Sequence, residues 1–209
     1  QTPQLLAATT PQQVHWRLGL HPFCHHRHAQ RIGQPHRTAH PRGRLFTVRI
    51  GGDDDTALAA FAGALAEQLV PGDVLCLFGS LGAGKTALTR HLARALGVGD
   101  DQYVSSPSFA LVHTYDGRLR IHHMDCYRLA DADEVAEAGL ADALETDGVA
   151  VVEWPERLGA LTPADRLDLR FEIEADQSRR ITLEPHGEPW QARLAELVRH
   201  LITLPSVNH

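Results

Sequence analysis

The sequence has few cysteines and lacks a long hydrophobic run. Its 209 residues include three cysteines, Cys24, Cys76 and Cys126, and no stretch of 18 or more apolar residues. Three scattered cysteines are too few for a disulfide framework, which excludes a small disulfide-stabilised domain and favours a reducing, cytoplasmic setting. Without such an apolar run, a membrane-spanning helix is excluded and no membrane partner is expected.

Lysine is almost absent as well. Lys85 is the only lysine in the sequence, beside 19 arginines. A solvated surface normally carries many lysines, and here arginine has taken their place. The ammonium group at position 85 therefore indicates a site where a guanidinium cannot substitute for it.

Acidic residues are missing from the first 44 positions. Residues 1–44 carry six Arg and no Asp or Glu, whereas the remainder carries 14 basic and 26 acidic residues, so the charges of the two parts are +6 and −12. The first part also holds seven of the 14 histidines and shows neither a helical nor a strand period. Residues 1–44 are therefore interpreted as a disordered or non-native extension.

Two other interpretations of the extension stay open. It is rich in Arg and poor in acidic residues, as organellar transit peptides are, although it lacks serine and a clean amphipathic repeat. Its group of four histidines and a cysteine offers ligands for a transition metal, although the spacing matches no closed structural site. That group consists of His21, Cys24, His25, His26 and His28.

From residue 45 onward the sequence alternates strand and helix patterns. We expect strands at 45–50, 74–78, 109–115, 119–126, 149–153, 166–175 and 179–184. We expect helices between Asp55 and Pro71, at 84–96, at 132–145 and from near Pro189 onward. This order predicts one α/β domain over residues 45–204, with three layers around a central mixed sheet, as in P-loop NTPases.

Residues 79–86 (GSLGAGKT) match the phosphate-binding pattern G-x-x-x-x-G-K-[ST]. The motif lies where the pattern requires it, between a buried strand and an amphipathic helix. Its glycines allow backbone N–H groups to converge on phosphates, and the helix start adds unpaired donors. Lys85 would contact the β and γ phosphates of ATP, and the Thr86 hydroxyl would bind Mg²⁺. The expected nucleotide contacts in the loop are Gly79, Leu81, Gly82, Ala83, Gly84, Lys85 and Thr86.

Mg²⁺ also needs a carboxylate in or near its coordination shell. Asp125 and Glu153 each end an apolar strand pattern, so both are expected beside the loop at the carboxyl edge of the sheet. An ordinary strand-end carboxylate is the alternative for each. His122 and His123 precede Asp125; on a strand they alternate, so one is expected to be buried and the other exposed rather than both catalytic.

Four segments together resemble the TsaE (YjeE) family of small P-loop ATPases. They are GSLGAGKT (79–86), SSPSF (105–109), HMDCYRL (123–129) and EWPERL (153–158). The resemblance implies that Lys85 and Thr86 bind nucleotide and Mg²⁺. It also implies roles for Asp125 as a Walker B-like acid and for Glu153 as a magnesium-associated acid.

The same resemblance adds two residues to the nucleotide site. Trp154 corresponds to a functional aromatic residue next to Glu153, although a Trp before Pro155 can also simply cover the core. Ser108 stands where the switch-like loop of the family usually has Thr, which keeps the hydroxyl and removes a methyl group. The proposed catalytic residues are Lys85, Asp125 and Glu153, and the proposed metal ligands are Thr86, Asp125 and Glu153.

The resemblance implies an ATPase that acts with TsaB and TsaD in forming threonylcarbamoyladenosine at tRNA position 37. RNA contact would come through these partners, because the acidic charge of residues 45–209 repels phosphate. The alternative is a P-loop nucleoside or small-molecule kinase, which usually needs an Arg-bearing lid; residues 97–109 and 129–148 contain no Arg at all. A nucleotide-dependent adaptor without catalysis is a third possibility.

Overall fold

The computed structural model describes residues 45–51, 55–144 and 147–203. The predicted extension, with its alternative metal group, and residue 204, the last of the predicted domain, lie outside the described residues.

Within these described ranges, seven strands form one mixed sheet in the order β1-β7-β6-β2-β5-β4-β3. Strand β2 is parallel to β5 and β6, and β4 is parallel to β5, whereas β1, β3 and β7 each pair antiparallel with a neighbour. The mixed sheet predicted from the sequence is confirmed. The strands are β1 (Phe46–Ile50), β2 (Val74–Phe78), β3 (Val112–Tyr115), β4 (Ile121–Asp125), β5 (Val149–Glu153), β6 (Arg166–Ile173) and β7 (Arg179–His186).

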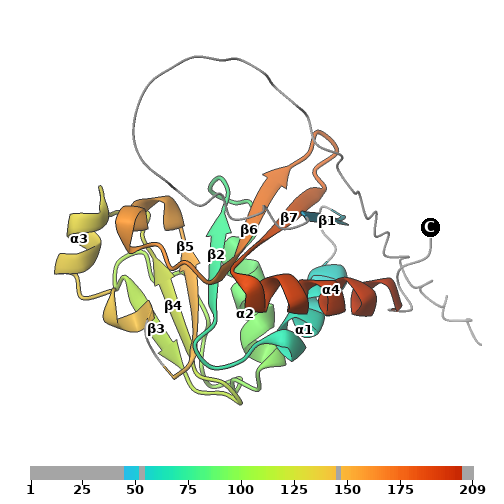
Figure 1. The fold of residues 1–209 in the computed structure, drawn as a ribbon, viewed down its shortest axis with the longest axis horizontal. Coiled ribbons are helices and arrows are strands. Elements are labelled where there is room, and N and C mark those ends of the chain that lie inside the picture. Colours follow the sequence, from blue (N-terminus) through green and yellow to red (C-terminus); the bar gives the residue numbers. More distant parts are fainter. Residues whose placement is uncertain (1–44, 52–54, 145–146, 204–209) are drawn as a thin grey trace, which may run out of the picture.

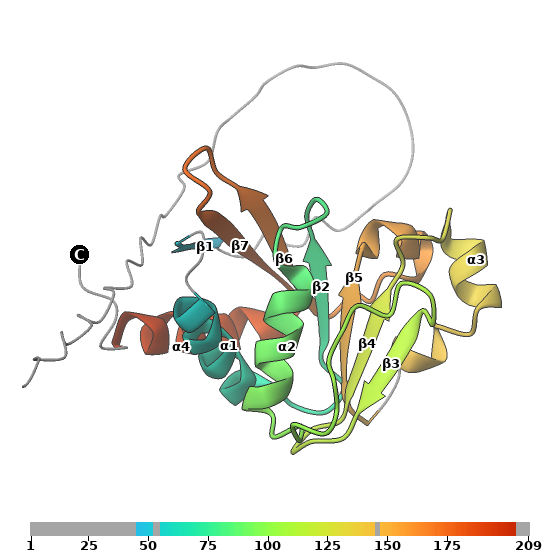
Figure 2. The same ribbon diagram turned by 180° about the vertical axis from the view of Figure 1, so that it is seen from behind.

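Helices lie on both faces of this sheet. The α-helices are α1 (Asp55–Gln68), α2 (Lys85–Ala95), α3 (Ala132–Glu137) and α4 (Glu188–Thr203), and two 3₁₀ segments are η1 (Asp142–Leu144) and η2 (Pro155–Leu161). Figures 1 and 2 show α1 and α4 beside β7 and β1, and α3 at the opposite end of the sheet. The arrangement has the three layers that the alternating pattern predicts.

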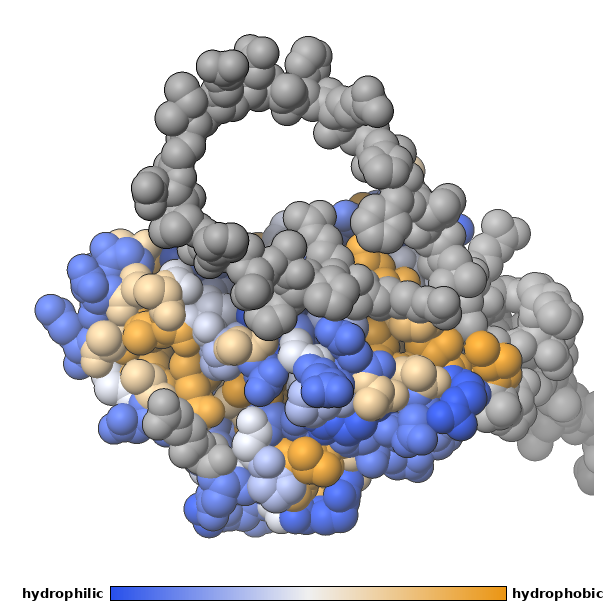
Figure 3. All heavy atoms as spheres, in the orientation of Figure 1, coloured by the Kyte–Doolittle hydropathy of each residue, from blue (hydrophilic) through white to orange (hydrophobic). Residues whose placement is uncertain are grey.

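Two hydrophobic clusters hold the layers together. The larger one joins α1, α2 and α4 to alternate residues of the sheet, among them Leu75 and Leu77 of β2, which are fully buried. The smaller one lies on the other face, where Cys76 of β2 packs near Val135 of α3 and Leu158 of η2. Strand β2 is therefore buried on both faces, as its continuous apolar run indicates. Figure 3 shows the exposed hydrophobic residues in small groups over α4 and over the end formed by β3–β5.

Two predicted elements are shorter in the structure by three residues or more at one end. The strand expected from residue 109 begins only at Val112, because Leu111 has a φ of 65° and donates its N–H to Pro107 in a turn. The helix expected over 132–145 ends at Glu137, because Gly139 adopts a φ of 70°, and a 3₁₀ turn follows. In both places a residue with a left-handed backbone conformation interrupts the predicted element: Leu111 before β3 and Gly139 after α3.

None of the helices in the described ranges has both the length and the apolar character needed to cross a lipid bilayer.

Candidate nucleotide-binding site

The loop between β2 and α2 depends on glycine backbone geometry. Gly79, Gly82 and Gly84 have φ values of 143°, 77° and 109°, which side-chain-bearing residues rarely adopt. A Cβ atom on Gly79 would also lie 2.8 Å from the carbonyl oxygen of Phe171 in β6. The loop can therefore turn tightly against the sheet and direct its backbone toward a ligand at the start of α2.

Lys85 reaches back over this loop from the first turn of α2. Its Nζ donates hydrogen bonds to the carbonyl oxygens of Gly79 at 2.8 Å and Ser80 at 3.0 Å. The ammonium also lies 4.2 Å from the centre of the Trp154 ring, within range of a cation–π interaction. Burial lowers the pKa of Lys85, while the nearby charges of Glu153 and Asp125 oppose that shift.

Glu153, at the end of β5, contacts the next residue of the helix. Its Oε1 accepts a hydrogen bond of 2.7 Å from the Thr86 hydroxyl. The same oxygen lies 2.9 Å from Nε2 of His123 on β4. Both Glu153 and His123 are almost completely buried. Of the two predicted acids, Glu153 is therefore the one in direct contact with the loop helix.

Asp125, at the end of β4, contacts a different loop. Its Oδ2 accepts a hydrogen bond of 2.6 Å from Ser108 and a second one from Ser106. Its Oδ1 accepts the backbone N–H of Tyr127 at 2.9 Å. The 105–108 loop is thus fastened to the acid through two hydroxyl groups. These contacts bring Ser108, a nucleotide-site residue implied by the family resemblance, next to Asp125.

Trp154 covers the site from the end of β5. It adopts a left-handed backbone conformation, with φ 59° and ψ 48°, immediately before Pro155 begins η2. This turn directs the indole toward Lys85 rather than along the strand, and the Tyr127 ring lies 4.9 Å from it. Trp154 is only half-buried. Its position favours a contact with the ligand site over a purely core-covering role.

These residues line one cavity of about 270 Å³. Of the residues that the sequence predicted, all except Gly79 line it, and Gly79 contributes the carbonyl group that holds Lys85. The sequence did not lead to three lining residues, Ala87, Ser106 and Tyr127, or to the link that His123 makes. Ser106 was within reach, since it lies in the segment 105–109 that carries the resemblance. The cavity is lined by Leu81, Gly82, Ala83, Gly84, Lys85, Thr86, Ala87, Ser106, Ser108, Asp125, Tyr127, Glu153 and Trp154.

The donor set of this cavity fits a nucleotide with a divalent cation. The positive-φ glycines and the start of α2 provide backbone donors for an anion, and Lys85 adds a positive charge. Thr86, Glu153 and Asp125 provide only oxygen ligands, which is the chemistry that Mg²⁺ prefers. Anion and cation donors thus meet in one small volume, as a magnesium–triphosphate complex requires.

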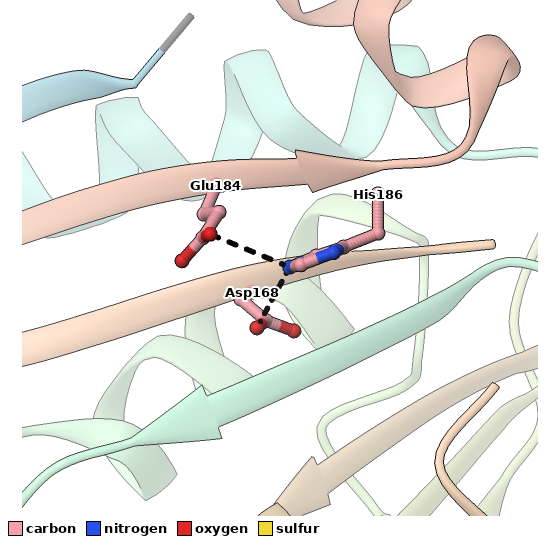
Figure 4. Close-up of side chains that lie close together, drawn as sticks. All are labelled: Asp168, Glu184 and His186. Atoms are coloured by element: carbon pink, nitrogen blue, oxygen red, sulfur yellow. Dashed lines mark hydrogen bonds and ion pairs between the residues drawn. The ribbon is translucent and has the colours of Figure 1, made fainter. Parts of the chain in front are cut away.

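A second cluster of ionisable residues lies on β6 and β7, where Asp168 is opposite Cys76 of β2 in the sheet. His186 contacts both Asp168 and Glu184 (Figure 4), at 3.0 Å and 3.9 Å. Asp168 is 1% exposed and also accepts hydrogen bonds from Arg166 and Arg170. Because two guanidinium groups already occupy its oxygens, we interpret this cluster as an ion-pair network around a buried carboxylate rather than as a metal site.

Comparison with known proteins gives consistent matches. The sequence model of the family described as "Threonylcarbamoyl adenosine biosynthesis protein TsaE" matches residues 53–181. The tRNA threonylcarbamoyladenosine biosynthesis protein TsaE of Bacillus subtilis is 37% identical over 149 residues, which cover 71% of this chain and 90% of that protein. The protein of the same name from Streptomyces coelicolor is 40% identical over 135 residues, covering 60% of this chain and 88% of the relative.

A solved structure agrees with the sequence relatives. The crystal structure of YdiB from Bacillus subtilis superposes with a TM-score of 0.63 at 31% sequence identity. The match covers 77% of this chain and 99% of YdiB. The sheet and helices described above therefore have an experimentally determined counterpart of nearly the same extent.

Proposed function

The chain belongs to the TsaE family of threonylcarbamoyl adenosine biosynthesis proteins, and from this membership we propose that it is a Mg²⁺-dependent ATPase acting in threonylcarbamoyladenosine formation at position 37 of tRNA. The proposed ATPase domain spans residues 45–204, and the proposed location is the cytoplasm. The proposed partners are TsaB and TsaD.

The observation that supports the proposal is that the glycine loop, Lys85 and Glu153 lie together in one cavity. Lys85 and Thr86 begin α2 directly after the glycine loop, and the Thr86 hydroxyl lies 2.7 Å from the Glu153 carboxylate. A glycine turn with only a structural role would not need a buried carboxylate and an ammonium group at the same helix start. Burial of both charged groups in one cavity supports a highly charged ligand.

Each residue has a distinct role in the proposed site. Lys85 would place its ammonium along the β and γ phosphates, and the loop N–H groups would hold the phosphate oxygens. Thr86 would bind Mg²⁺, with Asp125 and Glu153 in or near its coordination shell. When bound, the metal neutralises charge that develops on the phosphates. Trp154 and Ser108, which both line the cavity, would contact the nucleotide.

Glu153 is also the best placed residue to orient a water for attack. It is buried at the end of β5, and one of its oxygens is fixed by two hydrogen-bonding partners. Asp125 is bound by the hydroxyl groups of the 105–108 loop, so a cation at this acid would compete with or reorganise those bonds. We infer that the 105–108 loop responds to binding of the nucleotide and its metal.

Association with tRNA is proposed to be indirect. Residues 45–209 carry a net charge of −12, which opposes contact with a phosphate backbone. The cycle of ATP binding and hydrolysis would then reset the assembly with TsaB and TsaD between rounds of modification.

The test is phosphate release from ATP by the purified chain, alone and with TsaB and TsaD, beside a screen for phosphorylated small molecules. The proposal expects slow release by the chain alone, faster release with the partners, and no phosphorylated acceptor. A phosphorylated nucleoside or other small molecule would instead favour the kinase. Tight nucleotide binding with no phosphate release under any condition would favour a non-catalytic adaptor.

A further inference from the structure

A buried histidine lies beside the proposed catalytic acid. His123 is 0% exposed, although most histidines keep part of the ring in water. Its Nε2 lies 2.9 Å from Oε1 of Glu153. A polar ring in such a position loses its hydration on folding, so the hydrogen bond to Glu153 compensates for part of that cost.

The strand register explains why these two side chains meet. Ile121, His123 and Asp125 alternate along β4 and lie on the face covered by α2. In the parallel pairing of β4 with β5, Asp125 is opposite Glu153, so His123 is the diagonal neighbour of the acid. His122 points to the other face, where its Nδ1 contacts Thr114.

The hydrogen-bonding chemistry fixes the direction of this contact. An ionised carboxylate can only accept, so His123 donates through Nε2–H. In the part of the chain that the structure describes, the other ring nitrogen, Nδ1, is buried and has no hydrogen-bond partner. The polar contacts of the ring are therefore concentrated on Glu153.

We propose that His123 is a positioning residue that orients Glu153 for ATP hydrolysis. The ring and the Thr86 hydroxyl both bind Oε1, so these two contacts restrict the orientation of the carboxylate in the cavity that Glu153 lines. This inference rests on the proposed ATPase function. It adds a residue that does not contact nucleotide itself and acts through the acid, as outer-shell partners of metal and catalytic carboxylates do.

Substitutions that keep or remove the donor test this role. In His123→Gln, the amide nitrogen is the same number of bonds from the backbone as Nε2, so the contact can be kept. His123→Leu removes the donor. We expect His123→Leu to lower kcat about 10- to 100-fold with KM for ATP changed less than about threefold, and His123→Gln to recover most of the loss. The control, His122→Leu on the opposite face, should keep the wild-type kcat.

The hydrogen bond between His123 and Glu153 can also be measured without an activity assay. In a protein with ¹⁵N-labelled histidine, we expect His123 to give a slowly exchanging Nε2–H resonance, assigned by its loss in His123→Gln. Glu153→Gln replaces the charged acceptor with a neutral one and should shift this resonance upfield. Thermal unfolding of each variant shows whether it is folded before the comparison is made.

The outcomes separate this inference from the proposed function. If wild-type protein with its partners releases no phosphate, the ATPase proposal fails, while the Nε2–H measurement still decides the contact. If wild-type protein hydrolyses ATP and folded His123→Leu does so equally well, the positioning role is wrong. A ring proton on Nδ1, or a resonance that Glu153→Gln does not move, also overturns it.

Discussion

The Thr86 hydroxyl donates a 2.7 Å hydrogen bond to Oε1 of Glu153 and so joins the first turn of α2 to the carboxyl end of β5. The two residues are 67 positions apart in the sequence. Their contact arises because β5 pairs in parallel with β2, so the ends of both strands lie at the edge where α2 begins. The phosphate loop and the acid are therefore parts of one rigid arrangement.

The first prediction concerns this hydroxyl. Thr86→Val keeps the shape of the side chain and removes the donor, whereas Thr86→Ser keeps the donor. Because the hydroxyl is the proposed Mg²⁺ ligand, we expect Thr86→Val to weaken ATP binding in Mg²⁺ by about tenfold or more. Thr86→Ser should bind within a few-fold of wild type. Calorimetric titration measures both, and equal affinities for the two variants would contradict the role.

The second prediction uses the single lysine. Burial lowers the pKa of Lys85, so its amine loses its proton at a lower pH than an ordinary lysine. Amine reagents attack the neutral form, and labelling of Lys85 should therefore increase at a lower pH than labelling of a free lysine derivative. Mg-ATP should suppress it, because phosphate charge favours the ammonium form and covers it. Mass spectrometry of labelled peptides checks this, with the chain's α-amine as an internal reference. Nucleotide-independent labelling would argue against the site.

The third prediction compares two glycines. Gly79→Ala would place a Cβ 2.8 Å from the Phe171 carbonyl oxygen at a φ of 143°, so we expect a loss of about 1–3 kcal/mol in the free energy of unfolding and weaker nucleotide binding. A Cβ atom on Gly63 in α1 would meet no neighbouring element within 4 Å. Gly63→Ala should stabilise the fold by about 0.5–1 kcal/mol and leave binding unchanged. Urea unfolding compares the two, and similar effects would show that the loop tolerates a side chain.

The fourth prediction concerns the ion-pair network on β6 and β7. Asp168→Asn removes a buried charge that Arg166, Arg170 and His186 share, and we expect it to lower the free energy of unfolding by about 3 kcal/mol. Glu172 pairs with Arg180 at 3.6 Å and is 63% exposed, so Glu172→Gln should cost less than about 1 kcal/mol. Chemical denaturation measures both; a neutral effect of Asp168→Asn would show that the network does not stabilise the sheet.

The parts of this molecule set by local sequence were predictable. The Gly79–Thr86 motif, the apolar strand before it and the helix after it follow from residue spacing alone. The positions of Asp125 and Glu153 followed from one further step, since both end strands that belong to the parallel part of the sheet around β2. The residue pattern and the strand topology agree at this edge of the sheet, so the positions of both acids near the loop could be predicted, whereas their roles stay predictions.

Contacts that depend on strand register and on local backbone choices were not predictable. The contact between His123 and Glu153 depends on the pairing of β4 with β5. Alternation along the strand predicted only that one of His122 and His123 is buried. Leu111 adopts a left-handed backbone conformation, and β3 therefore begins only after it. Because this residue is not a glycine, its type does not indicate a turn. Gly139 was visible in the sequence, but glycine is also tolerated inside helices, so the end of α3 could not be placed.

The account depends most on the binding of a magnesium–nucleotide complex by the Gly79–Thr86 loop. The most direct test is calorimetric titration of purified protein with ATP in Mg²⁺ buffer, alone and with TsaB and TsaD, for wild type and Lys85→Ala. We predict saturable heat for wild type and none for a folded Lys85→Ala variant. No heat with wild type under any of these conditions, or equal affinity in the variant, would contradict the account.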